Sequence, residues 1–117
     1  MDSNIRITPW GRELLIRGGA GQAVTVKILT IEAGRRFSLQ KHKERDEAWT
    51  ILSPNGGIVT IGEDQYPAKS GRWFRIPAGT IHRLTAPPVG PLEVLEAAFG
   101  TFDQEDIIRL EDDYGRV

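Results

Sequence analysis

The sequence predicts an all-β protein, built as an antiparallel sandwich or barrel. Short segments in which apolar and polar residues alternate recur along the whole chain, and Gly, Pro, Asn or Asp residues separate most of them. Only residues 102–110, with Asp103 as the N-cap, are expected to form a short C-terminal helical turn. Many short strands with almost no helix are typical of sandwiches and barrels.

The expected strands can be placed in order along the chain. After a turn-like start, in chain order they span residues 12–17, 23–31, 37–42, 47–53, 57–61, 65–66, 72–76, 80–86 and 91–99. Residues 23–31 are rich in β-branched side chains, and one face of that strand is apolar throughout. The glycine-rich segment 18–21 is expected to be a hairpin loop, since no Gly-Lys-Ser/Thr follows it as in a phosphate-binding loop.

Length and composition limit the possible functions. The 117 residues suit one domain, 1–117, and the net charge of −1 gives no electrostatic reason to bind nucleic acid or an anionic membrane. The absence of cysteine excludes a disulfide, a thiolate metal site and a cysteine nucleophile. The sequence has no signal-peptide pattern and no apolar run of membrane-spanning length, so a cytoplasmic location is expected.

A polar hairpin over residues 37–49 carries the first candidate site. Gln40 and His42 share a strand face by parity, and Glu47 can face them across the turn. An amide oxygen, an imidazole and a carboxylate among apolar residues form a pattern typical of a metal site. His82 follows a Pro77-x-Gly79 turn, and a barrel can bring it to the same place. Taken alone, each histidine in a strand is more often structural than a ligand.

Two ordered motifs resemble those of the cupins, small jelly-roll barrels (double-stranded β-helices) with a metal in the mouth. The first has the spacing Gly34-x5-Gln40-x-His42-x4-Glu47, and the second matches from Gly71 to His82. This resemblance implies a single cupin domain with one divalent metal ion. Zinc is the ion expected first, and manganese, iron, cobalt or nickel would also suit the donors.

A narrower resemblance is to the cupin domain of type II mannose-6-phosphate isomerases. It covers nearly the whole chain in order, through residues 9–11, 38–42, 45–49, 76–84 and 106–116. The family's metal ligands correspond to Gln40, His42, Glu47 and His82. The resemblance implies exchange between mannose 6-phosphate and fructose 6-phosphate through an enediol, with the metal polarising the oxygens of C1 and C2.

The remaining roles in this isomerase hypothesis are assigned by chemistry. Glu96 and Lys27 are the candidates for the catalytic base, because burial would bring either pKa towards a useful range. The candidates for binding the phosphate of the sugar are Arg83, Arg109 and Arg116, because guanidinium groups suit bidentate contact with phosphate. A structural ion pair is the alternative for Glu96, Arg109 and Arg116, and a solvated strand position is the alternative for Lys27.

Other functions stay open. The chain departs from the family pattern at Pro54, Ala86, Glu44 and Ala98, so a metal-binding cupin that binds a sugar or sugar phosphate without turnover is one alternative. Another is a cupin enzyme of different chemistry, such as a dioxygenase or epimerase, although Gln40 weighs against a dioxygenase. Many family members carry a guanylyltransferase domain before the cupin, and that activity is not expected here. A homodimer formed through edge strands is expected.

Overall fold

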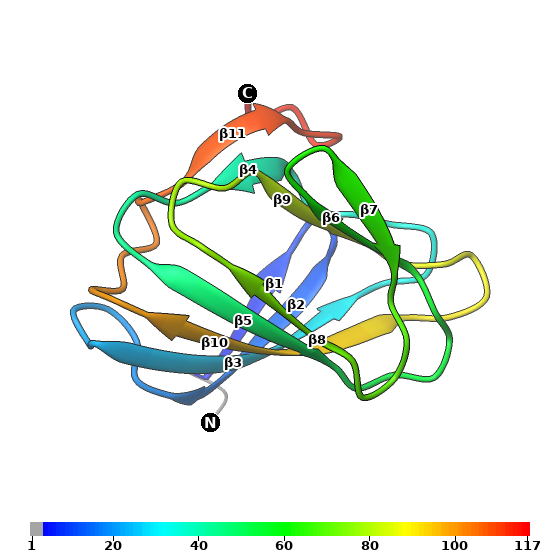
Figure 1. The fold of residues 1–117 in the computed structure, drawn as a ribbon, viewed down its shortest axis with the longest axis horizontal. Helices are drawn as coiled ribbons and strands as arrows, with labels where there is room; N and C mark the ends of the chain where they lie inside the picture. The colour runs from blue at the N-terminus through cyan, green and yellow to red at the C-terminus, as the bar shows by residue number, and fades with distance from the viewer. Residues whose placement is uncertain (1–3) are drawn as a thin grey trace.

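The computed structural model describes residues 4–117, which form two antiparallel sheets that face each other (Figure 1). The six-stranded sheet has the order β1-β2-β3-β10-β5-β8, and the five-stranded sheet has the order β11-β4-β9-β6-β7. The strands are β1 (Ile5–Thr8), β2 (Gly11–Arg17), β3 (Val24–Ile31), β4 (Leu39–Lys41), β5 (Asp46–Ile51), β6 (Ile58–Ile61), β7 (Asp64–Pro67), β8 (Trp73–Ile76), β9 (His82–Thr85), β10 (Leu92–Phe99) and β11 (Ile108–Glu111). This arrangement confirms the predicted all-β jelly-roll barrel.

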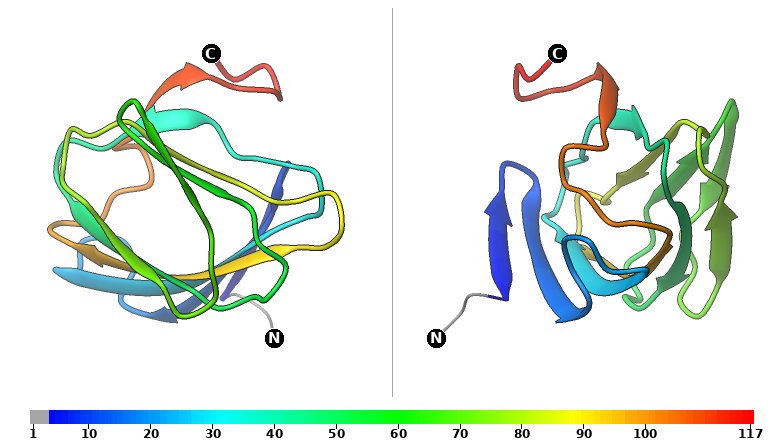
Figure 2. Two further views of the ribbon diagram at one scale, coloured as in Figure 1. Left: turned by 45° about the vertical axis from the view of Figure 1, so that its right-hand side comes forward. Right: turned by 90° about the vertical axis from the view of Figure 1, so that its left-hand side faces the viewer.

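The predicted helical turn near residues 102–110 is wrong. Residues 102–107 form a loop with a turn, and β11 follows it. This strand lies beside β4 in both views of Figure 2, with Ile108 paired to Lys41. The side chain of Asp103 accepts a hydrogen bond only from the backbone N–H of Glu105, at 2.9 Å, which makes a local turn. An isolated helical turn is unfavourable to nucleate, whereas pairing with β4 satisfies backbone groups at once. Residues 4–117 contain no helix that could cross a membrane.

Strand register places a row of residues on the inner face of the six-stranded sheet. Lys27 of β3 pairs with Glu96 of β10, Glu96 pairs with Trp49 of β5, and Trp49 pairs with Phe74 of β8. Residues that are paired directly across an antiparallel sheet project from the same face. The interior of the barrel therefore receives two ionisable side chains, Lys27 and Glu96, beside aromatic ones.

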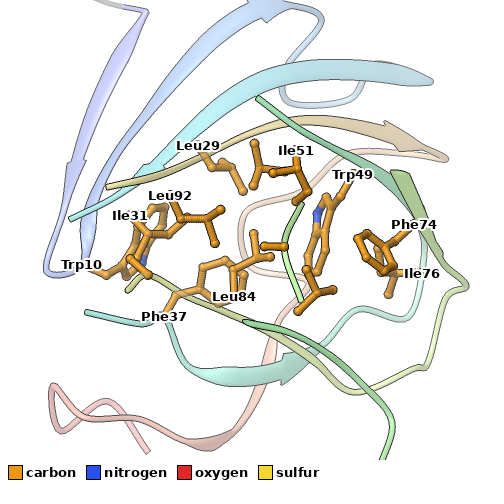
Figure 3. Packing of buried hydrophobic residues seen from close by; sticks show 14 residues of the cluster. Trp10, Leu29, Ile31, Phe37, Trp49, Ile51, Phe74, Ile76, Leu84 and Leu92 are labelled. Atoms are coloured by element: carbon orange, nitrogen blue, oxygen red, sulfur yellow. The ribbon is translucent and has the colours of Figure 1, made fainter. Parts of the chain in front are cut away.

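Trp49 joins the hydrophobic core to this polar row. Its ring is fully buried among the apolar side chains of both sheets (Figure 3), while its indole Nε1 donates a 3.0 Å hydrogen bond to Glu96. The core consists of Trp10, Leu29, Ile31, Phe37, Trp49, Ile51, Val59, Ala68, Phe74, Ile76, Leu84, Ala86, Leu92 and Val94. Buried Tyr and Trp side chains need a partner for their polar atom, so Glu96 is built into the packing of the core.

Gly100, directly after β10, approaches the turn that follows β4 closely. Its φ is +122°, and a Cβ at this position would lie 2.3 Å from the carbonyl oxygen of Glu44. Gly100→Ala is therefore expected to lower the free energy of unfolding by about 2–4 kcal/mol, from backbone strain and steric overlap. Urea denaturation measures this loss. Gly21→Ala is the control, since Gly21 also has a positive φ but no atom within 4 Å of that Cβ. Equal losses in both variants would contradict the role of the close approach.

The outer face of the six-stranded sheet exposes large apolar side chains. Trp73 of β8 is 63% exposed and Phe99 of β10 is 49% exposed. The homodimer and the cytoplasmic location expected from the sequence stay predictions, and light scattering of the purified chain tests the first of them.

Candidate metal centre

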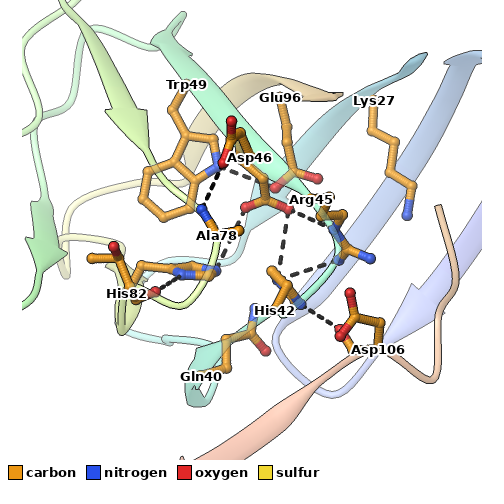
Figure 4. Close-up of polar contacts among 12 residues, drawn as sticks. Lys27, Gln40, His42, Arg45, Asp46, Trp49, Ala78, His82, Glu96 and Asp106 are labelled. Atoms are coloured by element: carbon orange, nitrogen blue, oxygen red, sulfur yellow. Dashed lines mark hydrogen bonds and ion pairs between the residues drawn. The ribbon is translucent and has the colours of Figure 1, made fainter. Parts of the chain in front are cut away.

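Three strands bring His42, Glu47 and His82 together in the interior of the barrel. His42 follows β4 directly, Glu47 lies on β5 and His82 begins β9. One ligand atom from each residue lies within 4.8 Å of those of the other two, and all three side chains are buried. Figure 4 shows His42 and His82 beside Arg45 and Gln40. Glu47 bridges the histidines, with Oε2 3.6 Å from Nε2 of His42 and Oε1 3.5 Å from Nε2 of His82.

Backbone carbonyls fix the orientation of both imidazole rings. Nδ1 of His42 lies 2.6 Å from the carbonyl oxygen of Asp106, and Nδ1 of His82 lies 2.9 Å from that of Thr80. A carbonyl oxygen only accepts hydrogen bonds, so Nδ1 carries the proton in both rings and donates it. Each Nε2 therefore presents its lone pair to Glu47. Histidines that bind metal typically have one ring nitrogen held in this way by a carbonyl. Nε2 of His82 has no hydrogen-bond partner among the described residues, whereas Nε2 of His42 also lies near Arg45.

Two atoms of this cluster are buried without a hydrogen-bond partner among the described residues. They are Oε1 of Glu47 and Nε2 of His82, which face each other. A buried polar atom left without a partner costs about 1–3 kcal/mol. A divalent cation bound between the two atoms would satisfy both, so the residues present fit a metal ion. The prediction that the ion is zinc is not supported, because this donor set suits several first-row ions.

Gln40 lies next to the triad. It pairs with His82 across β4 and β9, and it lines a cavity that His42 and Glu47 also line. Its Oε1 accepts a 2.8 Å hydrogen bond from the hydroxyl of Ser38. Because an amide oxygen has two lone pairs, this bond leaves one free. The predicted role of Gln40 as a fourth ligand stays a prediction.

Arg45 is a contact of the triad that the sequence analysis did not assign. Its Nε donates to Oε2 of Glu47 at 3.1 Å, and its Nη2 lies 3.2 Å from Nε2 of His42. Its Nη1 donates a hydrogen bond to the carbonyl oxygen of Asp103, at 3.0 Å, and its guanidinium carbon lies 4.5 Å from the ring centroid of Phe102. Arg45 falls in the expected turn, where strand parity gives no direction. The one sequence signal for this role was that Arg45 belongs to residues 45–49, one of the segments that resemble the family.

Burial sets the charge states of the triad. It lowers the pKa of His42 to about 3, with help from the nearby charges of Arg45 and His82, and lowers that of His82 to about 4. Burial raises the pKa of Glu47, and the adjacent Arg45 opposes that rise. Both histidines are therefore neutral at neutral pH, as metal ligation requires.

The two predicted base candidates also line this cavity. Burial, together with the negative charge of Glu47, raises the pKa of Glu96 to about 8. Lys27 donates from Nζ to Oε1 of Glu13 at 2.7 Å, and Nζ lies 4.4 Å from the ring centroid of Phe102. Glu96 is therefore protonated at neutral pH, and Lys27 already has a carboxylate partner.

The cavity lined by His42 and Glu47 has a volume of about 50 Å³, and several arginines also line it. Arg109 and Arg116, both predicted to bind phosphate, line it together with Arg6. Arg83 lies elsewhere: its Nε donates to the carbonyl of Phe37 at 2.9 Å and its Nη1 to Glu111 at 3.2 Å. The structure thus brings two of the three predicted arginines to the site and adds Arg6, which no sequence pattern indicated.

Comparison with known proteins identifies the family. The family described as "Mannose-6-phosphate isomerase C-terminal" matches residues 3–112. The chain belongs to this family. Members similar to it include the xanthan biosynthesis protein XanB of Xanthomonas campestris pv. campestris, which is 38% identical over 93% of the chain. The mannose-1-phosphate guanylyltransferase RfbM of Salmonella typhimurium is 38% identical over 88% of the chain, and the alginate biosynthesis protein AlgA of Pseudomonas aeruginosa is 37% identical over 93%.

Solved structures agree on the fold. A cupin protein from Bacteroides fragilis is 25% identical, with a TM-score of 0.61 over 68% of the chain and 67% of its own. A cupin-2 domain protein from Rhodospirillum rubrum has a TM-score of 0.68 over 91% of the chain and 72% of its own, at 16% identity. The capsular polysaccharide assembling protein CapF of Staphylococcus aureus has a TM-score of 0.75 over 92% of the chain and 34% of its own, at 17% identity.

The relatives correct the predicted activity. They are named as mannose-1-phosphate guanylyltransferases or for polysaccharide biosynthesis, and nucleotidyl transfer is a different reaction from aldose–ketose exchange. The prediction that this family member is a mannose-6-phosphate isomerase, an enzyme of sugar-phosphate isomerisation, is therefore wrong. The chain spans about a fifth of the length of these relatives, 23% of XanB, 21% of RfbM and 22% of AlgA.

Proposed function

We propose that the chain is a cupin domain that binds one divalent metal ion and, through it, a sugar or sugar phosphate. The observation that carries the proposal is the buried triad of His42, Glu47 and His82, with two unpartnered atoms facing each other at 3.5 Å. Bound there, a divalent ion supplies positive charge and open coordination positions for ligand oxygens.

The chemistry of the cavity supports a polyhydroxylated ligand. Gln40, Glu96 and Gln104 line it together with His42 and Glu47, and their side chains offer hydrogen-bond donors and acceptors. Neighbouring hydroxyl groups of a sugar can use these side chains and the open positions of the ion together. Relatives named for mannose 1-phosphate and for polysaccharide biosynthesis point to the same class of ligand.

Glu96 and Lys27 act as binding groups in this proposal. A protonated Glu96 can donate a hydrogen bond to a sugar oxygen as well as accept one from Trp49. Lys27, held by Glu13, keeps a positive charge beside the cavity. Both side chains are fixed by these contacts, so they restrict how a sugar is oriented at the ion.

A cobalt titration tests the proposal. Protein stripped of metal with a chelator is expected to bind one Co²⁺ per chain and to unfold at a higher temperature with the ion than without it. Mannose or mannose 1-phosphate is then expected to change the visible absorption of the bound cobalt, since a sugar oxygen enters its coordination. Failure to bind Co²⁺, Mn²⁺, Ni²⁺ or Zn²⁺ would refute the metal site. Metal binding with an unchanged spectrum would refute the sugar part alone.

A further inference from the structure

Arg45 uses two of the ligand atoms of the triad. Its Nε donates to Oε2 of Glu47 at 3.1 Å, and its Nη2 lies 3.2 Å from Nε2 of His42 (Figure 4). Because Nδ1 of His42 carries the proton, Nε2 is an acceptor with a single lone pair. That lone pair receives the hydrogen bond from Arg45, so it cannot bind a metal ion at the same time.

The other half of the triad is open. Oε1 of Glu47 and Nε2 of His82 lie 3.5 Å apart, and neither has a hydrogen-bond partner among residues 4–117. Coordination by all three residues therefore requires Nη2 of Arg45 to leave His42. Nε of Arg45 can stay on Glu47, since a carboxylate oxygen has two lone pairs.

Glu47 depends on Arg45 for its counter-charge. Both side chains are buried, and in the described part of the chain Arg45 is the only Lys or Arg that forms an ion pair with Glu47. The guanidinium is fixed by the carbonyl oxygen of Asp103, 3.0 Å from Nη1, and by the ring of Phe102. Removing one partner of a buried ion pair is strongly destabilising, because the other charge stays buried. Arg45 therefore stabilises the folded chain through Glu47.

We propose that Arg45 is an internal cation that competes with the divalent ion for His42 and Glu47 and thereby sets the affinity of the site. This inference rests on the proposed function and concerns the regulation of the same site. A guanidinium and a divalent ion beside one carboxylate also repel each other, most strongly where burial lowers the dielectric constant. Binding of an ion therefore costs the contact between Arg45 and His42, and this cost lowers the affinity.

A supporting role for Arg45 is the alternative, and it predicts the opposite effect on affinity. Partners that support a metal-binding histidine commonly hold the ring nitrogen that does not face the ion. In His42 that nitrogen is Nδ1, and the carbonyl oxygen of Asp106 holds it at 2.6 Å. Arg45 instead contacts Nε2, the nitrogen that lies 3.6 Å from Glu47 and is the ligand atom itself. The geometry therefore favours competition over support.

The variant Arg45→Met separates the two roles, because methionine keeps most of the length of the side chain and removes the charge and every donor. The chelated variant is expected to unfold at a lower temperature than the chelated wild-type protein, since Glu47 has lost its partner. In competition with a chelating dye it is expected to bind Co²⁺ about tenfold more tightly. Co²⁺ should therefore raise its unfolding temperature by more than it raises that of the wild type. A purely structural role would lower the stability without this gain in affinity.

Two further variants control the measurement. Arg45→Lys keeps a cation for Glu47, but its ammonium nitrogen ends where the guanidinium carbon lies, one bond short of Nη2. We expect its stability and its Co²⁺ affinity to lie between those of the wild type and Arg45→Met. Arg75→Met is the matched control and should change neither quantity, because Arg75 is exposed on β8 and has one 3.4 Å ion pair.

The inference is wrong if both Arg45 variants, with their fold verified by circular dichroism, bind Co²⁺ no more tightly than the wild type. Weaker binding would show that Arg45 supports the ligands, and unchanged binding would show that it has no effect on the site. If Arg45→Met does not fold, the affinity of Arg45→Lys decides alone.

The same titration distinguishes this inference from the proposed function. If the wild-type protein binds Co²⁺ and the variants bind it no more tightly, the metal site stands and only the competition is refuted. If the wild type binds no ion but Arg45→Met does, the proposed function fails for this chain and the competition is supported. If none of these proteins binds an ion, both are refuted.

Discussion

Replacing Glu47 with Gln is expected to lower the affinity for a divalent ion at least about 100-fold. Glu47 contributes the negative charge of the triad and contacts both histidines, at 3.6 and 3.5 Å. Structural Zn²⁺ in zinc-finger peptides binds with about 10–16 kcal/mol, so one of four ligands contributes about 3 kcal/mol, or about a factor of 100. Glutamine keeps the shape of the side chain and an oxygen that accepts from Arg45, so the barrel should persist.

Competition with a chelating dye measures this loss, and circular dichroism checks the fold. Glu44→Gln is the matched control, because Glu44 is an exposed acid in the turn just before β5. We expect that control to bind Co²⁺ as the wild-type protein does. A Glu47→Gln variant that keeps wild-type affinity would show that the ion is held elsewhere.

The metal-free protein is expected to be most stable near pH 6.5 and to lose about 2 kcal/mol of unfolding free energy by pH 8. The folded pKa of Glu96, about 8, is raised above the ordinary value of 4.5, so its stabilising contribution is lost as the pH rises through 8. His42 and His82 have folded pKa values of about 3 and about 4, lowered from 6.5, so their contributions are lost as the pH falls below 6.5. Between pH 6.5 and 8 only the Glu96 proton changes among these three, at about 1.4 kcal/mol per pH unit.

Urea denaturation in the presence of a chelator, at intervals from pH 5 to pH 8.5, measures this profile. Glu96→Gln should flatten the limb above pH 6.5, because an amide does not titrate but still accepts the hydrogen bond from Trp49. The limb below pH 6.5 should remain, since both histidines are unchanged. An alkaline limb that is equally steep in Glu96→Gln would assign the titration to another group.

Strand parity explains why most of the metal centre was predictable from the sequence. Gln40 and His42 alternate along one strand, and two ordered motifs fix the positions of Glu47 and His82. Arg45 lies in a turn, where parity assigns no face, so its contact with Glu47 needed the structure. The prediction of isomerase activity failed for another reason. The motifs define a family and a site, but relatives of this chain are named for a different reaction.

For the C-terminal part of the barrel, the predicted secondary structure was wrong although the predicted overall fold was right. Residues 102–110 begin with a helix-like pattern at Asp103, but the chain pairs with the edge of β4 and forms β11 instead. Arg6 was missed because β1 resembles no motif, and only its pairing with β2 brings the side chain near Glu13. Both errors concern partners that are distant in sequence, which local patterns cannot report.

The carbonyl of Asp106 that orients His42 has a consequence for how the protein is made. The two residues are 64 positions apart, and β10, which pairs with both β3 and β5, also lies late in the chain. At a synthesis rate of about 5–20 residues per second, roughly 3–13 s pass on the ribosome between the two residues. During that interval the ring of His42 lacks the carbonyl that fixes its protonated nitrogen. A divalent ion bound by the triad would therefore meet a completed site only after Asp106 has been synthesised.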